Sequence, residues 1–334
     1  MRKYLLPQSG TFYKANLHCH TNISDGKLSP EEVKKIYKDQ GYSIVAYTDH
    51  DVLLSHQDLA DETFLPLNGY EMEVTQTHNA PSRSKKTCHI CLVALDPENL
   101  TQVCYHRSKY MIGNGEAYRE QIRFDENEPD FEREYTHACV NEIMKKGQES
   151  GFFVTYNHPG WSLETYNDYI GYENMHAMEI CNFGCIATGY PDYNEKEYDE
   201  MLRSGKRIYC IAADDNHNWE TDSFGGFTMI KADSLDYKAI ADALVAGSFY
   251  ASEGPEIYDL WFEEGKIHIT CSPAAKIVLN TGYRRAAICQ DPEGGTVTEA
   301  TFDVLPEDGY VRITVTDPQG KHANTSAYFT DTLF

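Results

Sequence analysis

Two histidines separated by one residue lie near the start of the chain and could act together as metal ligands. His18 and His20 follow an apolar run that begins at Phe12. If this run is a strand, residues two apart point to the same face, so the two imidazoles aim together. Imidazole suits zinc, manganese or iron, and the carboxylate of Asp25 is a hard oxygen ligand that could extend the site. Because close histidine pairs also occur by chance on surface strands, this interpretation depends on the rest of the chain.

The segment after the histidine pair predicts how it is positioned. Ser29 is a typical helix N-cap, and Glu32 lies three residues later, as a capping box requires. The next apolar run after this helix ends at His50. A strand, a helix and a second strand form a βαβ unit whose strands are expected to be parallel and adjacent. His50 would then lie beside the first two histidines, at the carboxyl-terminal rim where barrel enzymes carry their chemistry.

Similar apolar runs recur along the chain, and each carries or precedes a further candidate ligand. Glu71 follows the run that begins at Phe64, and His89 lies within the run from Thr87 to Ala94. Taken singly, each has an ordinary explanation, such as a loop cap or a solvated carboxylate. Their common placement on strand-like runs favours one shared site. The six histidines and three carboxylates are His18, His20, Asp25, His50, Glu71, His89, His158, Asp215 and His217.

Two other regions interrupt or end this pattern. An excursion from about residue 100 to 130 carries Arg107, Arg119 and Arg123, which are candidates to bind a substrate or, singly, solvated surface arginines. Near Ser252 the pattern changes to short alternating segments with turns, which is typical of a small antiparallel β module. We therefore expect a main domain over residues 1–252 and a β module over residues 253–334.

Composition limits the classes of function. The chain has 334 residues and a net charge of −23, which argues against a general basic surface for nucleic acid. An anionic substrate stays compatible with this charge, because bound metals reverse the sign locally. No apolar run is long enough to span a membrane, and the N-terminus does not read as a signal peptide. Ten scattered cysteines indicate reduced thiols and a cytoplasmic location. Nothing in the sequence specifies an oligomeric state.

With these motifs in order, the sequence closely resembles the PHP family, the polymerase and histidinol phosphatase metallohydrolases. The resemblance covers about residues 11–252, and the later module looks like the tail of stand-alone members related to carbamate hydrolases. Asp214 departs from the pattern, since family members usually carry a small residue there. The motifs that carry the resemblance are Asn16-Leu17-His18-Cys19-His20-Thr21, Ser24-Asp25-Gly26, Thr48-Asp49-His50, Gly69-Tyr70-Glu71, His89, Asn157-His158-Pro159 and Asp215-Asn216-His217.

The resemblance implies an α/β fold, a distorted TIM-like (β/α) barrel of seven parallel strands with helices outside. It also implies two or three divalent metal ions, zinc, manganese or iron, in a trinuclear centre. Carried over by position, His18, His20, Glu71 and Asp215 would hold the first metal. Asp25, His50 and His217 would hold the second, and Glu71, His89 and His158 the third.

This centre would make the protein a hydrolase, and the leading hypothesis is a metal-dependent phosphoesterase (phosphatase). It would act on a small phosphorylated metabolite or nucleotide, with a metal-bridging hydroxide as nucleophile and no catalytic side chain assigned. The first alternative is a carbamate, ester or amide hydrolase that uses the same centre. The second is a metal-binding module without turnover, which the complete ligand set disfavours.

Overall fold

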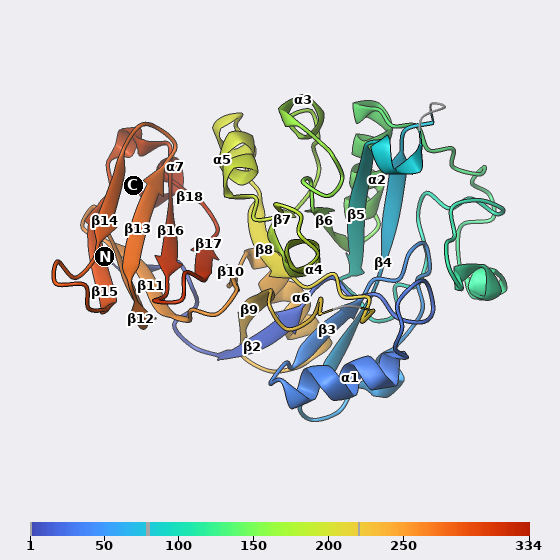
Figure 1. Ribbon diagram of the computed structural model, residues 1–334, viewed down its shortest axis with the longest axis horizontal. Coiled ribbons are helices and arrows are strands. Elements are labelled where there is room, and N and C mark those ends of the chain that lie inside the picture. The colour runs from blue at the N-terminus through green and yellow to red at the C-terminus, as the bar shows by residue number, and fades with distance from the viewer. Residues whose placement is uncertain (1, 78–80, 220) are drawn as a thin grey trace.

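The computed structural model describes residues 2–77, 81–219 and 221–334, which form a large mixed sheet with helices and a separate antiparallel sheet (Figure 1). The longer helices are α1 (Pro30–Asp39), α2 (His137–Glu149), α5 (Glu195–Arg203) and α6 (Tyr237–Ala246), and the shorter ones α3 (Tyr166–Tyr169), α4 (Phe183–Ala187) and α7 (Thr330–Leu333). The strands are β1 (Lys3–Tyr4), β2 (Thr11–Asn16), β3 (Ile44–Tyr47), β4 (Leu65–Thr75), β5 (Thr87–Ala94), β6 (Phe152–Asn157), β7 (Ala177–Asn182), β8 (Tyr209–Ala213), β9 (Phe227–Ala232), β10 (Phe249–Ser252), β11 (Ile257–Glu263), β12 (Lys266–Ala274), β13 (Lys276–Thr281), β14 (Ala286–Cys289), β15 (Val297–Asp303), β16 (Tyr310–Thr316), β17 (His322–Thr325) and β18 (Tyr328–Phe329).

The part of the large sheet that carries the predicted ligands runs in the order β10-β9-β2-β3-β4-β5-β6-β7-β8. The expected βαβ unit is present, because β2 and β3 are parallel and α1 connects them. The prediction of seven parallel strands is wrong. Strand β5 is antiparallel to both of its neighbours, and β9 is antiparallel to β2 and β10.

The short connection between β4 and β5 explains the reversal of β5. Only residues 76–86 separate the two strands, and the one helical segment described among them is the 3-10 turn Ser82–Ser84. A parallel neighbour needs a crossover of a dozen or more residues, usually with an α-helix, whereas an antiparallel neighbour needs only a loop. Since β5 is buried throughout and β4 over most of its length, no polar face in either sequence indicated the direction of the strand.

Side-chain contacts connect β8, the last strand of this run, with β9 near its other end. Thr228 of β9 bonds through its hydroxyl to both the N–H and the carbonyl of Ala212 in β8. Beyond these strands, Cys19 and Asn216 form an isolated parallel bridge. Within the described residues, β8 and β9 share no strand ladder, so the predicted barrel is not closed by backbone pairing there.

Helix boundaries follow local capping. The Ser29–Glu32 capping box predicted for α1 is formed. The helix expected from Phe131 instead begins at His137, where Thr136 is the N-cap and accepts a hydrogen bond from the N–H of Cys139. None of the described helices is long and apolar enough to cross a membrane.

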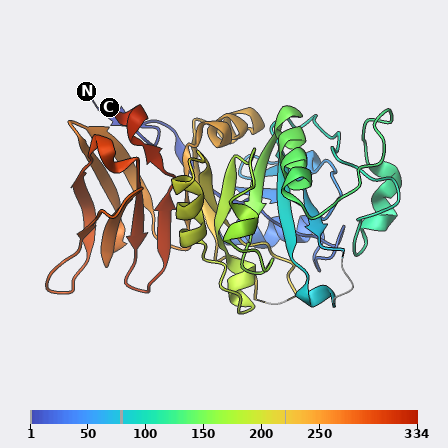
Figure 2. The ribbon, with the colours of Figure 1, turned by 90° about the horizontal axis from the view of Figure 1, so that it is seen from above.

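The β module packs two sheets over an apolar core. One sheet has the order β1-β11-β12-β15, and the other strands continue the large sheet through the pairing of β10 with β17. Both chain ends lie at this module (Figures 1 and 2). The N-terminal strand β1 pairs with β11 of the module, so the first residues of the chain associate with its last segment.

Candidate metal centre

All nine predicted ligands lie together at one rim of the large sheet. His18 and His20 follow β2, His50 follows β3, and Asp215 follows β8. His89 is the third residue of β5 and reaches the same rim because this strand is reversed. The full set gathered there is His18, His20, Asp25, His50, Glu71, His89, His158, Asp215 and His217.

The inner part of the cluster has the spacing of a metal coordination shell. The Nε2 atoms of His18 and His20 lie 3.0 Å apart. Each lies 3.1–3.2 Å from Oδ1 of Asp215 and 3.2–3.3 Å from a carboxylate oxygen of Glu71. With metal–ligand bonds of about 2.1 Å, neighbouring ligand atoms lie about 3.0–3.4 Å apart. These four side chains are the set expected for the first metal.

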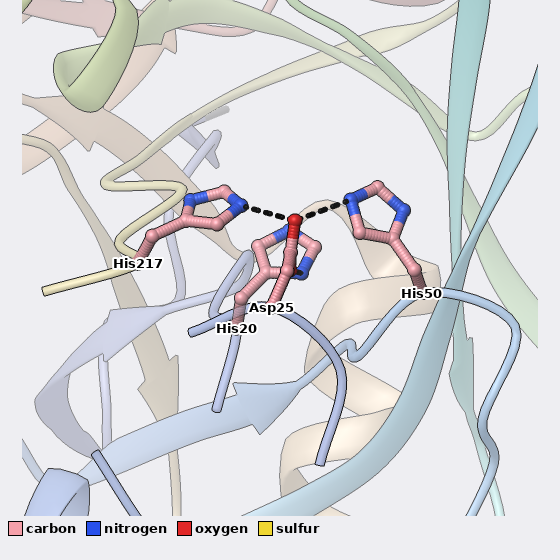
Figure 3. Close-up of side chains that lie close together, drawn as sticks. All are labelled: His20, Asp25, His50 and His217. Carbon is pink, nitrogen blue, oxygen red and sulfur yellow. Dashed lines mark ion pairs between the residues drawn. The ribbon is translucent and has the colours of Figure 1, made fainter. Parts of the chain in front are cut away.

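The outer part of the cluster surrounds Asp25, as Figure 3 shows. Its Oδ2 atom lies 3.4 Å from Nε2 of His217 and 3.8 Å from Nε2 of His50. The ring of His20 stacks on both of these histidines, so it adjoins the second set as well as the first. Burial, and then the charge of His20, lower the pKa of His50 to about 3. His50 is therefore neutral at neutral pH, the form that binds a metal.

Glu71 is the centre of the whole arrangement. Its Oε1 atom lies 3.1 Å from Nδ1 of His89 and 3.4 Å from Nε2 of His158, while Oε2 lies 3.3 Å from Nδ1 of His50. Burial opposes ionisation, but the charges of His18 and His89 outweigh it and hold the pKa of Glu71 well below its ordinary value. One carboxylate thus faces all three predicted ligand groups, as a bridging ligand must.

Several polar atoms of the cluster lack a hydrogen-bond partner and are suited to bind metal ions. Buried polar groups in folded proteins almost always have a hydrogen-bond partner. Nine buried side-chain nitrogen or oxygen atoms of the described residues lack one, and five of them belong to the cluster. Divalent metals would give them partners, and histidine with carboxylate is a donor set that zinc, manganese and iron accept. The five atoms are Nδ1 of His20, Nδ1 of His50, both ring nitrogens of His89 and Oδ1 of Asp215.

Glu179 is a further member of the site that the sequence analysis missed. Its Oε1 atom accepts a 2.8 Å hydrogen bond from Nδ1 of His18. Its Oε2 atom accepts from the backbone N–H of His158 and from the amide of Asn182, which also donates to Asp215. A carboxylate behind a ligating histidine fixes its tautomer and orientation. In the sequence, the one sign of Glu179 was a single carboxylate within an otherwise uncharged strand, and the structure shows that all residues of this strand, β7, are buried.

Backbone strain accompanies two of the ligands. His158 and Asp215 adopt positive φ angles of 27° and 52°, which are unfavourable for residues with a side chain.

Preceding Asp215, the buried carboxylate of Asp214 accepts hydrogen bonds from Tyr37 and from three backbone N–H groups at residues 224–226. Asp214, the departure from the family pattern, therefore holds the loop that follows the ligands of β8.

The three candidate substrate-binding arginines lie apart from the cluster. Arg107 forms a 2.7 Å ion pair with Asp130, and Arg119 forms one of 2.6 Å with Glu116. Arg123 is exposed, and its backbone forms a bridge to Thr101. None of the three lines the cavity over the cluster. The arrangement therefore gives no support to the prediction that they bind substrate.

A different arginine, just after the same excursion, lies next to the site. Arg133 is buried and forms a bidentate ion pair with Asp51, the residue after His50. It also donates to the backbone carbonyl of Glu73. A buried bidentate pair fixes geometry as well as charge. Arg133 thus connects the excursion to the loop that carries one ligand.

The cluster opens into a cavity of about 310 Å³. Small-molecule sites begin at about this size. Seven of the nine ligands line it, together with two tryptophans. The lining residues are Asp25, His50, Glu71, Glu73, His89, Ile112, His158, Trp161, Gly184, Cys185, Thr188, Asp215, His217, Trp219 and Asp222.

The chain was compared with curated proteins and with solved structures. No curated protein matches the chain at a significant level. Among solved structures, the chain is similar to a two-domain protein from Bacteroides vulgatus that contains a predicted PHP-like metal-dependent phosphoesterase. That similarity has 16% identity and a TM-score of 0.47, and it covers 98% of this chain and 97% of that chain. An amidohydrolase from Chromobacterium violaceum with bound sulfate and no metal is similar at 16% identity and a TM-score of 0.37, over 61% of this chain and 87% of that chain.

The comparison with family models is more direct. The model of the PHP domain matches residues 16–216, which include eight of the nine predicted ligands. This span is more than half of the 334 residues. The chain belongs to the PHP domain family.

Proposed function

We propose that the protein is a metal-dependent phosphoesterase that hydrolyses a small phosphorylated metabolite or nucleotide. The observation that supports this most is the position of Glu71, whose two oxygens face ligands of all three predicted metal sites. Adjacent metals sharing a carboxylate are suited to an anion that offers several oxygens. A phosphoryl group is such an anion.

Charge supports a phosphate ester over a carbamate. Divalent ions in this centre would supply positive charge to the phosphoryl oxygens and acidity to a water nucleophile. Among the nine ligands only Asp25, Glu71 and Asp215 contribute negative charge, so three dications would leave the ligand set itself positive even when Glu179 is counted, while Glu73 and Asp222 add negative charge elsewhere in the cavity. A carbamate presents one carbonyl oxygen and little charge, and it would gain less from this surplus.

The side chains around the ligands have positioning roles in this proposal. Glu179 accepts a hydrogen bond from Nδ1 of His18, which leaves Nε2 to face the other ligands of the first predicted metal. Asp49 accepts hydrogen bonds from Thr21 and Ser24, and these bonds hold the loop between His20 and Asp25. Pre-organised ligands of this kind avoid reorganisation during the reaction.

The test is a matched kinetic comparison on enzyme reconstituted separately with manganese, iron and zinc. We expect two or three metals per chain by elemental analysis. The catalytic efficiency for phosphate esters should exceed that for carbamates by at least about tenfold, or about 1.4 kcal/mol of transition-state stabilisation. Inorganic phosphate should inhibit competitively, since it would occupy the same pocket.

Two results would count against the proposal. Fewer than one metal per chain after reconstitution would remove the multinuclear centre. Faster cleavage of carbamates or esters, without inhibition by phosphate, would instead favour the alternative hydrolase. The Asp25→Asn variant removes a predicted ligand of the second metal, and it should lose metal and phosphate hydrolysis together.

A further inference from the structure

Two of the three tryptophans of the chain line the cavity over the metal centre. Trp161 is 39% exposed and Trp219 is 63% exposed. Large aromatic side chains contribute most when they are buried, so exposed ones at the mouth of a cavity mark a surface that a ligand could cover. These side chains are therefore candidates to determine the substrate.

Trp161 is held firmly beside the ligands. The carboxylate of Asp192 accepts hydrogen bonds from its backbone N–H at 2.7 Å and from that of Gly160 at 2.8 Å. Its ring stands nearly perpendicular to the rings of His89 and His158, with centroids 5.2 and 5.3 Å away. The indole of Trp161 therefore packs directly against the two histidines of the third predicted ligand group.

A second cavity lies on the other side of Trp161. It has a volume of about 580 Å³, and it shares Trp161 and Glu73 with the cavity over the metals. Leu163 and Tyr190 give it apolar surface, and Arg83 and Lys85 give it positive charge. Trp161 thus lies at the boundary between two adjoining cavities, the smaller one over the predicted ligands and the larger one on the side of Leu163 and Tyr190.

We propose that the substrate extends from the metal centre across Trp161 into this second cavity, and that its leaving group carries a planar unsaturated ring. The ring lies against the indole, as a nucleobase would, because stacked π systems gain from such contact. This inference rests on the proposed phosphoesterase activity. In the reaction, an oxygen of water forms a bond to phosphorus while the ester P–O bond breaks, and the leaving oxygen takes up a proton. A nucleoside and inorganic phosphate result.

The test compares adenosine 5′-monophosphate with ribose 5-phosphate on the metal-loaded protein. Both are primary alkyl phosphates, so they differ in the ring and not in the scissile bond. We expect a ratio of catalytic efficiencies of at least about ten in favour of the nucleotide, equivalent to about 1.4 kcal/mol. The Trp161→Ala variant should bring the ratio close to one, mainly through KM, and Trp161→Phe should restore most of it. Because both substrates are measured on one preparation, any loss of metal from the variant cancels in the ratio.

Trp261→Ala is the matched control, since Trp261 lies in β11 of the module, outside both cavities. Its ratio should equal that of the unmodified protein. A ratio near one in the unmodified protein, or one unchanged by Trp161→Ala, would overturn the inference and leave the phosphoesterase proposal intact. If neither phosphate is hydrolysed, quenching of tryptophan fluorescence by adenosine 5′-monophosphate decides the ring site, and the phosphoesterase proposal is decided separately by its own kinetic comparison. Quenching by the nucleotide that Trp161→Ala abolishes would support that site, and no quenching would overturn it.

Discussion

The metal centre and the β module bury polar groups in opposite ways. In the centre, six of the nine ligands are buried, and several of their polar atoms lack a hydrogen-bond partner among the described residues. In the module, the buried guanidinium of Arg312 is paired with the carboxylates of Asp199 and Glu195 on α5. Asp308 is also buried there and is paired with Arg285, and most of the remaining core is apolar. The buried charges of the module are therefore paired by side chains of the chain itself, whereas the ligands of the centre are arranged as if to bind added ions.

The strongest test of this contrast is the substitution of the shared ligand. Glu71→Gln should lower phosphoesterase efficiency by at least about a thousandfold, equivalent to about 4 kcal/mol, because it disturbs the first and third metals together. Its control is His89→Ala, which should empty only the third site. Anomalous diffraction on both variants measures each site separately. Equal loss at all sites in the two variants would show that the assignment of ligands is wrong.

The opposite test breaks the ion pair of the module. Arg312→Met should lower the free energy of unfolding by about 3 kcal/mol, since it removes the hydrogen-bonded cation of the largely buried Asp199 carboxylate and leaves only the more exposed Arg203, 3.5 Å away. Metal content should not change, because Arg312 lies outside the centre. Urea unfolding measures the first effect and elemental analysis the second. A double variant, Arg312→Met with Asp199→Leu, should recover much of the stability, and a loss of metal in either variant would contradict the separation of the two regions.

The same contrast explains what could be predicted from the sequence. His18 and His20 were identifiable because their spacing matches the period of a strand, and His50 because a capped helix leads to it. The position of His89 was predicted, but the direction of β5 was not. The sequence of a buried strand does not indicate whether the strand runs parallel or antiparallel to its neighbours. Glu179 and the Arg312–Asp199 pair had no local pattern at all. The contacts of Glu179 with His18 and of Arg312 with Asp199 each span more than 100 residues, and only the fold brings these partners together.

A smaller effect is expected behind the ligands. Glu179→Gln should weaken metal binding by about ten- to a hundredfold, the range found when the partner of a ligating histidine is changed. The amide can accept a hydrogen bond through its oxygen, but its NH2 group would face the N–H of His158 and the amide of Asn182. Competition with a chelator of known affinity measures the change. The exposed substitution Glu142→Gln is the control, and a binding constant unchanged in both variants would show that His18 is positioned without Glu179.

The most gradual expected effect, at most about 1.4 kcal/mol per pH unit, concerns Glu164, a buried carboxylate that has no cation beside it among the described residues. It accepts hydrogen bonds from the hydroxyls of Tyr135, Tyr156 and Tyr172. Burial nevertheless raises the pKa of Glu164 from its ordinary value of 4.5 to about 7, in contrast to the lowered pKa of Glu71. Between these two pH values the folded protein keeps a proton that the unfolded chain has released. Stability is therefore fully present below about pH 4.5 and falls as the pH rises towards 7, by at most about 1.4 kcal/mol per pH unit.

Glu164→Gln should remove this contribution, because an amide does not titrate. Urea unfolding of the metal-saturated protein between pH 5 and 7.5 measures the slope, with Glu142→Gln again as the exposed control. If Glu164→Gln leaves the pH dependence unchanged, the three tyrosine hydroxyls already compensate for burial of the charge. Hydrogen bonds alone would then suffice to keep a buried carboxylate ionised in this region, and the lowered pKa of Glu71 would no longer distinguish the metal centre from its surroundings.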